Sequence, residues 1–383
     1  MNKKLALNMM VGPADVALAL RCLESFEANR LFDEIVVVVT SKDEQLAEQL
    51  RNAIDGPARC IIVADFFTPE DPKGNFARVR NIARVNTTSE YIMWLDSDDI
   101  TDDSSRQSLY KMKQCVVTKD FDYFRVRYSL GDGRSLYRDR IFKNSPEVFW
   151  KYSCHEQLEY PYGAKYATIN GVTVIHAPMK LAALSINRNM EILEHEYAKD
   201  PSNIFYKFHL TKELLASCRN NAWPVEAHFP GAYSNAMELI SQHVISGDAA
   251  AKLCIDIVSL SLPEDWARSE TLLYIAMAHD NSFAEAEILL GQLYLSKRQY
   301  DLAIKLFMSS IGRTRESSQE QIEQMYTTEP MKGLTEAYYR KGELELALYW
   351  SSRYLKMVPN DKDFSEFRAE LCQSLINTYS RMK

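Results

Sequence analysis

Short apolar runs and amphipathic segments alternate over the first 180 residues. Runs of strand length lie at residues 5–11, 34–40, 59–65 and 91–96, and the run from Ile35 to Val39 is apolar on both faces. Such a run is typical of a central parallel strand that is buried on both sides. Segments with apolar residues three and four apart lie between the strands, at residues 16–29, 43–54 and 75–87. This alternation predicts βαβ crossovers and a mostly parallel sheet, which is the α/β fold class.

The pattern changes in the second half of the chain. Segments 122–128 and 135–142 flank Gly131-Asp132-Gly133 and predict a β-hairpin, and residues 167–175 are again strand-like. Helical periodicity then dominates, as in residues 187–197, 205–216, 249–259 and 271–279, with a loop predicted over 220–233 where breakers gather. We therefore predict an α/β domain over residues 1–180 and an all-α domain over residues 181–383.

The end of the chain contains an internal repeat. Leu290, Tyr294 and Ala303 recur 44 residues later as Leu334, Tyr338 and Ala347. The spacing of large residue, tyrosine and alanine resembles the tetratricopeptide repeat, although that repeat has a period of about 34 residues. We expect two helical hairpins of one design, with an added helix or loop over residues 313–326. Such repeats bind peptides or partner domains, or mediate self-association; an ordinary helical hairpin is the alternative.

Composition limits the classes of protein that remain. The 383 residues are 46% apolar and 25% charged, which is ordinary for a globular protein of two or three domains. The net charge of −7 counts against a protein that binds nucleic-acid backbone over much of its surface. The seven cysteines include no Cys-x-x-Cys pair, so we expect no disulfide framework and a cytoplasmic location. The sequence contains no apolar run of about 18 residues, so we predict no transmembrane helix.

Candidate chemistry concentrates where the predicted strand at 91–96 ends. Asp96, Asp98 and Asp99 place three carboxylates within four residues. Open α/β sheets bind ligands beyond the carboxyl ends of their strands, and carboxylates this close repel one another unless a cation compensates them. Mg²⁺ or Mn²⁺ would suit these ligands and would also bind phosphate oxygens. The alternative is a solvated acidic loop that caps the next helix.

In this context the chain resembles a family 2 glycosyltransferase of the GT-A fold. The matching features, in chain order, are the strand at 33–39, the helix with Arg80 and Asn81, the Asp-x-Asp pair of Asp96 and Asp98, residues 140–144, and His155 with Glu156. The resemblance covers residues 1–180, and helical tails of the tetratricopeptide type also occur beside such domains. It implies a metal-dependent, inverting transfer of a sugar from a nucleotide-diphosphate donor, by default a UDP-sugar, to an acceptor nucleophile.

The resemblance also implies roles for individual residues. Mn²⁺ or Mg²⁺ would be bound by Asp96, Asp98 and His176. The nucleotide-sugar would be contacted by Asp96, Asp99, Arg80, Asn81 and Asp65, the last in place of the missing Asp near Thr40, and Arg138 and Arg140 are candidates for lining the diphosphate. Glu156 would be the general base, and His155 a second catalytic candidate. For each residue a structural role, such as a cap, an ion pair or a core histidine, is the alternative.

Two other functions are compatible with these residues. One is a non-catalytic scaffold in which the repeats bind a partner and the α/β part is a degenerate transferase. The other is a nucleotidyl- or phosphoryltransferase that uses the same acidic pair. The absence of a G-x-x-x-x-G-K loop counts against the nucleoside-triphosphate hydrolases. The acceptor stays open among a glycan, a protein side chain and a modified nucleobase.

Overall fold

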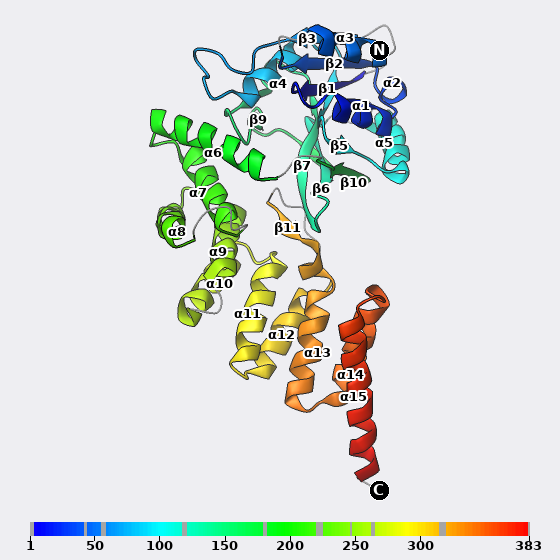
Figure 1. The fold of residues 1–383 in the computed structure, drawn as a ribbon, viewed down its shortest axis with the longest axis vertical. Helices are drawn as coiled ribbons and strands as arrows, with labels where there is room; N and C mark the ends of the chain where they lie inside the picture. Colours follow the sequence, from blue (N-terminus) through cyan, green and yellow to red (C-terminus); the bar gives the residue numbers. More distant parts are fainter. Residues whose placement is uncertain are drawn as a thin grey trace. The chain divides into compact units, whose positions relative to one another are not determined.

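The computed structural model describes residues 4–41, 44–54, 59–116, 121–178, 182–219, 225–245, 247–261, 265–313 and 319–381 (Figure 1). The chain divides into two compact units, one that ends at Ser217 and one that begins at Cys218. By contacts, helix α6 (Ala182–Lys199) and most of helix α7 (Ile204–Arg219) belong to the first unit. The contacts therefore divide the chain later than residue 180, where the residue pattern changes.

The first unit is built on a mixed sheet whose N-terminal strands are parallel. The strand order is β3 (Arg59–Val63), β2 (Glu34–Val39), β1 (Leu5–Val11), β4 (Tyr91–Asp96), β7 (Arg134–Lys143), β6 (Tyr123–Ser129), β10 (Tyr166–His176) and β5 (Asp99–Ile100). Strands β1 to β4 pair in parallel, β7 is antiparallel to both β4 and β6, and β6 is parallel to β10. The mostly parallel N-terminal sheet and the β6–β7 hairpin confirm the prediction.

Helices cover both faces of this sheet. Alternate residues of β1 divide between two apolar layers, with Leu7 and Met9 in one and Ala6 in the other. The first layer is closed by α1 (Val16–Ser25), α3 (Glu44–Ala53) and α5 (Asp103–Val116), and the second by α4 (Phe76–Val85). Helix α4 therefore lies on the face that also receives Trp94 of β4 and Trp150 of the short strand β8 (Phe149–Lys151).

One predicted helix of the first unit is in fact two. The segment at residues 16–29 was predicted as a single helix, but α1 ends at Ser25 and α2 (Ala28–Leu31) follows. The break is at Glu27, whose φ of 45° is left-handed and cannot continue a right-handed helix. Apolar spacing alone does not reveal such a break, because Phe26, Ala28 and Leu31 are all buried.

The second unit is helical and contains the two predicted hairpins. Its helices are α8 (Val225–Ser241), α9 (Gly247–Ser261), α10 (Trp266–His279), α11 (Ala284–Ser296), α12 (Tyr300–Ser310), α13 (Glu329–Lys341), α14 (Leu344–Met357) and α15 (Lys362–Arg381). Helix α11 packs on α12, and α13 on α14. Phe307 of α12 fills the space beside Gly291 and Gly333, where an added Cβ would lie 2.7 Å and 2.5 Å from its ring. The described part of the predicted insertion holds β11 (Gln321–Ile322) and the 3₁₀ turn η1 (Glu323–Tyr326).

The loop predicted over residues 220–233 is wrong from Val225 onward. Residues 220–224 lie outside the described residues, but α8 begins at Val225 and runs through Pro230. Pro230 lies in the second turn, where its missing N–H removes a single bond to a carbonyl of the first turn. Ala232, Ala236 and Leu239 are buried along one face of α8. Burial of that face outweighs the helix-breaking signal of Pro230.

Among the residues that the structure describes, we find no helix that combines the length and the apolar character needed to cross a lipid bilayer.

Candidate active site

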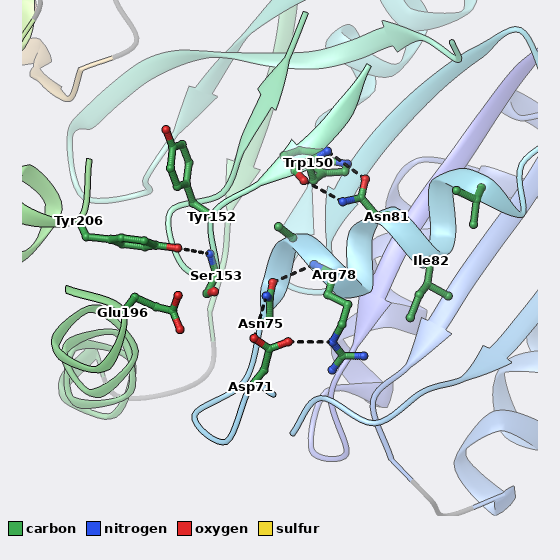
Figure 2. A pocket seen from close by; sticks show the side chains of 12 residues that line it. Asp71, Asn75, Arg78, Asn81, Ile82, Trp150, Tyr152, Ser153, Glu196 and Tyr206 are labelled. Atoms are coloured by element: carbon green, nitrogen blue, oxygen red, sulfur yellow. Dashed lines mark hydrogen bonds and ion pairs between the residues drawn. The ribbon is translucent and has the colours of Figure 1, made fainter. Parts of the chain in front are cut away.

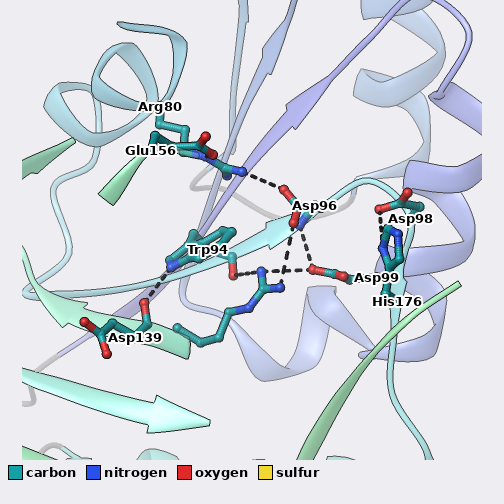
Figure 3. A network of polar contacts seen from close by, with 9 residues as sticks. Arg80, Trp94, Asp96, Asp98, Asp99, Asp139, Glu156 and His176 are labelled. Carbon is teal, nitrogen blue, oxygen red and sulfur yellow. Dashed lines mark hydrogen bonds and ion pairs between the residues drawn. The ribbon is translucent and has the colours of Figure 1, made fainter. Parts of the chain in front are cut away.

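The acidic turn lies between β4 and β5, and the sheet brings His176 to it. Strand β4 ends at Asp96, a turn at Ser97 and Asp98 follows, and β5 begins at Asp99. Strand β5 is antiparallel to the end of β10, so that Asp99 lies opposite His176 (Figure 3). Ligand atoms of Asp98, Asp99 and His176 lie within 4.8 Å of one another. This cluster differs from the predicted ligand set in one member, because Asp99 rather than Asp96 lies in it.

Asp99 is a buried carboxylate with one unused oxygen. Its Oδ2 accepts a hydrogen bond from the Asp96 backbone N–H at 2.9 Å and pairs with Arg140 Nη1 at 3.0 Å. Its Oδ1 has no hydrogen-bond partner among the described residues. Burial raises the pKa of Asp99 to about 6, with Arg140 opposing the shift and the charges of Asp96 and Asp98 adding to it. A buried, unpartnered carboxylate oxygen beside a second carboxylate is suited to a cation.

His176 completes this cluster as an imidazole. Its Nδ1 lies 3.4 Å from Asp98 Oδ1. Burial acts against its charged form, but the nearby carboxylate of Asp98, with the charges of Asp99 and Asp96, raises the pKa of His176. Two carboxylates and one imidazole form a ligand set that Mn²⁺ accepts readily.

Arg80 joins Asp96 to Glu156. Its Nη2 lies 2.6 Å from Asp96 Oδ1, and its Nε lies 2.6 Å from Glu156 Oε1 (Figure 3). The guanidinium is held between Trp94 and Trp150, 4.4 Å and 5.0 Å from their ring centroids. Burial acts to raise the pKa of Asp96, but the positive charge of Arg80 outweighs it. The pKa of Asp96 therefore lies well below its usual range. Residues from α4, from the end of β4 and from the segment before β9 (Gln157–Glu159) thus meet at one ion-pair network.

Arg140 of β7 is the counter-ion beneath this network. It is fully buried, and its Nη2 lies 3.7 Å from Asp96 Oδ2 while Nη1 pairs with Asp99. Its guanidinium also lies 3.9 Å from the Trp94 ring centroid. Burial acts against its charge, but Asp99 and Asp96 raise the pKa of Arg140 above its usual value. Arg140 therefore compensates two carboxylates at the end of β4.

Three other predicted site residues have partners of their own. The side-chain amide of Asn81 bonds both the N–H and the carbonyl of Trp150, at 2.9 Å and 2.8 Å, and so ties α4 to β8. Asp65 follows β3, and its carbonyl accepts from the Arg78 guanidinium. His155 turns toward α7, where its Nε2 lies 2.9 Å from Glu213 Oε1.

A groove of about 650 Å³ adjoins this centre at Trp150 (Figure 2). Its walls come from α4, the residues around Ser153, and helices α6 and α7. Its polar groups bond one another: Asn75 caps α4 by accepting from the Arg78 N–H, Arg78 pairs with Asp71, and Tyr206 accepts from the Ser153 N–H. The Phe76 N–H of α4 donates to the Ser153 carbonyl at 2.9 Å, so α4 and α7 both hold the segment before Glu156.

Sequence reasoning missed several members of this site. Trp94 and Trp150 were not predicted as site residues, although they hold Arg80, because an apolar strand gives no signal for such a role. His209 and Glu213 lie in the predicted helix at residues 205–216, where a polar residue is expected to face solvent. Arg140 was considered for the diphosphate, and its burial against Asp99 has no sequence signal.

Comparisons with known proteins give similarities of structure alone. No model of a protein family matches the chain, and no curated protein matches it. The structure is similar to that of S. aureus TarS residues 1–349 in complex with UDP-GlcNAc, with 13% identity, 80% of this chain and 91% of that chain covered, and a TM-score of 0.37. It is also similar to a tetratricopeptide repeat protein from Parabacteroides merdae, with 15% identity, coverage of 51% and 70%, and a TM-score of 0.37. A third similarity is to a Thermus thermophilus tetratricopeptide repeat protein, with 15% identity, coverage of 50% and 93%, and a TM-score of 0.30.

Proposed function

We propose that the first unit is a metal-dependent glycosyltransferase of the GT-A type, which transfers a sugar from a nucleotide-diphosphate donor with inversion. The observation that carries this proposal is the meeting of two groups at the carboxyl end of β4. One is the Asp98, Asp99 and His176 cluster, and the other is the Arg80 bridge between Asp96 and Glu156. Ligands of open α/β sheets bind at this end of the strands. The motifs that resemble family 2 glycosyltransferases support the same reading.

The donor set fits a divalent cation. Asp99 offers a buried oxygen without a hydrogen-bond partner among the described residues, and Asp98 and His176 offer two further ligand atoms within reach. We assign these three residues to Mn²⁺ or Mg²⁺, which when bound would stabilise negative charge on the diphosphate leaving group. Asp96 was predicted as a ligand, but its pairing with Arg80 and Arg140 favours a role in holding the network.

Glu156 is assigned as the general base. Inverting transfer needs a group that takes the proton of the acceptor, and a carboxylate on the acceptor side supplies it. Arg80 holds Glu156 Oε1, so we assign the other oxygen, Oε2, to the acceptor. Because Trp94 and Trp150 fix the guanidinium, the direction of the carboxylate is set before substrate binds.

For the donor nucleotide and the acceptor we propose a class of molecule only. Thr40 follows β2 and its hydroxyl bonds the Val11 carbonyl, so a neutral group lies where family members carry an Asp. We keep UDP as the donor nucleotide and Asp65 as its contact. The helical hairpins of the second unit favour a macromolecular acceptor or a partner protein.

UDP together with Mn²⁺ is expected to raise the Tm of the full chain, because a ligand that binds the folded state stabilises it. The gain is about 2.7 kcal/mol at a ligand concentration of 100 times the Kd. Asp98→Ala should abolish the Mn²⁺-dependent part of this shift, as measured by differential scanning fluorimetry. Asp103→Ala is the matched control, since Asp103 is an exposed carboxylate of the same segment that pairs with Arg106. An equal shift in wild type and Asp98→Ala would refute the metal assignment, and no binding by wild type would favour the scaffold.

A further inference from the structure

The backbone before Glu156 has an unusual conformation. Tyr152 and His155 both adopt left-handed φ angles, of 73° and 54°, although neither is glycine. Residues other than glycine rarely adopt left-handed φ angles, and they keep them only where surrounding contacts hold the backbone in place. Residues of this kind gather at functional sites. The contacts that hold this segment therefore decide where the Glu156 carboxylate lies.

Helix α7 supplies those contacts from one face. Phe205 stacks on Tyr152 with ring centroids 3.4 Å apart and an interplanar angle of 6°. The Tyr206 hydroxyl accepts from the Ser153 N–H at 3.2 Å (Figure 2). One turn further, His209 stacks on His155 at 4.4 Å and 14°. Residues 205, 209 and 213 are four apart, so they follow one another along a single face of the helix. That face is directed at the segment from Tyr152 to His155.

Glu213 ends this series with a charged contact. Its Oε1 lies 2.9 Å from His155 Nε2 and accepts a second hydrogen bond from Asn189 at 3.4 Å. A carboxylate accepts only, so this bond places a proton on His155 Nε2 and selects one orientation of the ring. Burial opposes its charge, but the hydrogen bond and the charge of His155 hold the pKa of Glu213 below its usual value. Burial lowers the pKa of His209, which stacks on His155, and the charges of His155 and Lys212 lower it further.

We propose that Glu213 is a positioning residue for Glu156, acting through His155, and that α7 is part of the catalytic unit. This inference deepens the proposed function and depends on it. The metal cluster lies elsewhere, with Asp98 in the turn after β4, Asp99 on β5 and His176 at the end of β10. Loss of the Glu213 contact should therefore lower kcat and leave donor binding unchanged. A displacement of about 1 Å at a reacting group can cost 10²-fold in rate.

The test uses the full chain and hydrolysis of the UDP-sugar that wild type accepts, with Mn²⁺. We expect Glu213→Ala to lower kcat by about 10- to 100-fold with the KM for donor unchanged. Glu213→Gln keeps an acceptor oxygen for His155 Nε2 and should recover most of the rate. Glu191→Ala is the matched control, because Glu191 is an exposed carboxylate of α6 that pairs with Lys73. The Mn²⁺-UDP shift in Tm reports folding and donor binding in each variant.

The outcomes separate this inference from the proposed function. Wild-type hydrolysis with an unchanged kcat in Glu213→Ala would overturn the positioning role and leave the transferase assignment standing. A Glu213→Ala variant that loses rate and donor binding together would show a structural role only. Equal losses in the Ala and Gln variants, both folded, would also overturn it. A wild type that neither binds nor hydrolyses any donor contradicts the proposed function and this inference with it.

Discussion

Glu156→Gln is expected to lower the rate of sugar transfer, and of donor hydrolysis, by about 10²- to 10⁴-fold, the range that a positioned general base contributes. The amide keeps an oxygen that can accept from Arg80 Nε, so the network of Arg80 and Asp96 should persist. What is lost is the carboxylate that takes the acceptor proton. Donor KM and the Mn²⁺-UDP shift in Tm should change little, because the loss lies in the chemical step.

A matched control separates catalysis from surface charge. Glu159 lies on β9 (Gln157–Glu159), three residues after Glu156, and pairs with Lys151 at 3.5 Å on the surface. Glu159→Gln should retain the wild-type rate. If Glu156→Gln and Glu159→Gln have the same kcat as wild type, Glu156 is not the base, and its role is to hold Arg80.

Arg140→Met is expected to lower the free energy of unfolding of the first unit by about 3–5 kcal/mol, the cost of removing one partner of a buried ion pair. Arg140 is fully buried and compensates Asp99 and Asp96. Methionine keeps an unbranched apolar side chain in place of the arginine stem but leaves both carboxylates without this cation. Urea denaturation followed by tryptophan fluorescence measures the loss. Arg134→Met is the control on the same strand, where the exposed pair with Asp132 should contribute about 0–1 kcal/mol.

The loss should depend on pH with a definite sign. The pKa of Asp99 is raised to about 6 in the folded protein, so Asp99 binds a proton more tightly folded than unfolded. Stability from such a group is present at low pH and falls as pH rises through the folded pKa. Without Arg140 the pKa of Asp99 rises further, so the difference between Arg140→Met and wild type should be larger at pH 8 than at pH 5. A difference independent of pH would show that lost packing, not uncompensated charge, causes the destabilisation.

Much of the sheet could be predicted because strands buried on both faces leave long apolar runs. The run from Ile35 to Val39 is β2, and the carboxylates after Leu95 stand where β4 ends. The helices were harder to delimit. Glu27 breaks one helix without a sequence signal, and Pro230 fails to break another because Ala236 and its neighbours are buried.

The candidate site was predictable only where residues are close in sequence or match a motif. The pairing of His176 with Asp99 depends on a two-residue strand that joins β10 across a long separation in sequence, and no local pattern encodes it. The placement of Arg80 depends on Trp94 and Trp150, and the sequence alone does not distinguish these two residues from ordinary core residues. Glu213 has no sequence signal at all, since a glutamate within a helix is expected to face solvent.

A screen of nucleotide-sugars with donor hydrolysis as the readout, with and without Mn²⁺, tests the central claim most directly. Water replaces the acceptor in this assay, so the acceptor need not be known. We predict that one class of nucleotide-diphosphate sugar, with UDP-sugars first, is hydrolysed to the nucleoside diphosphate and the sugar only when Mn²⁺ is present. Hydrolysis that is unaffected by chelation, release of pyrophosphate from a nucleoside triphosphate, or no turnover and no binding of any donor would contradict the assignment of a metal-dependent glycosyltransferase.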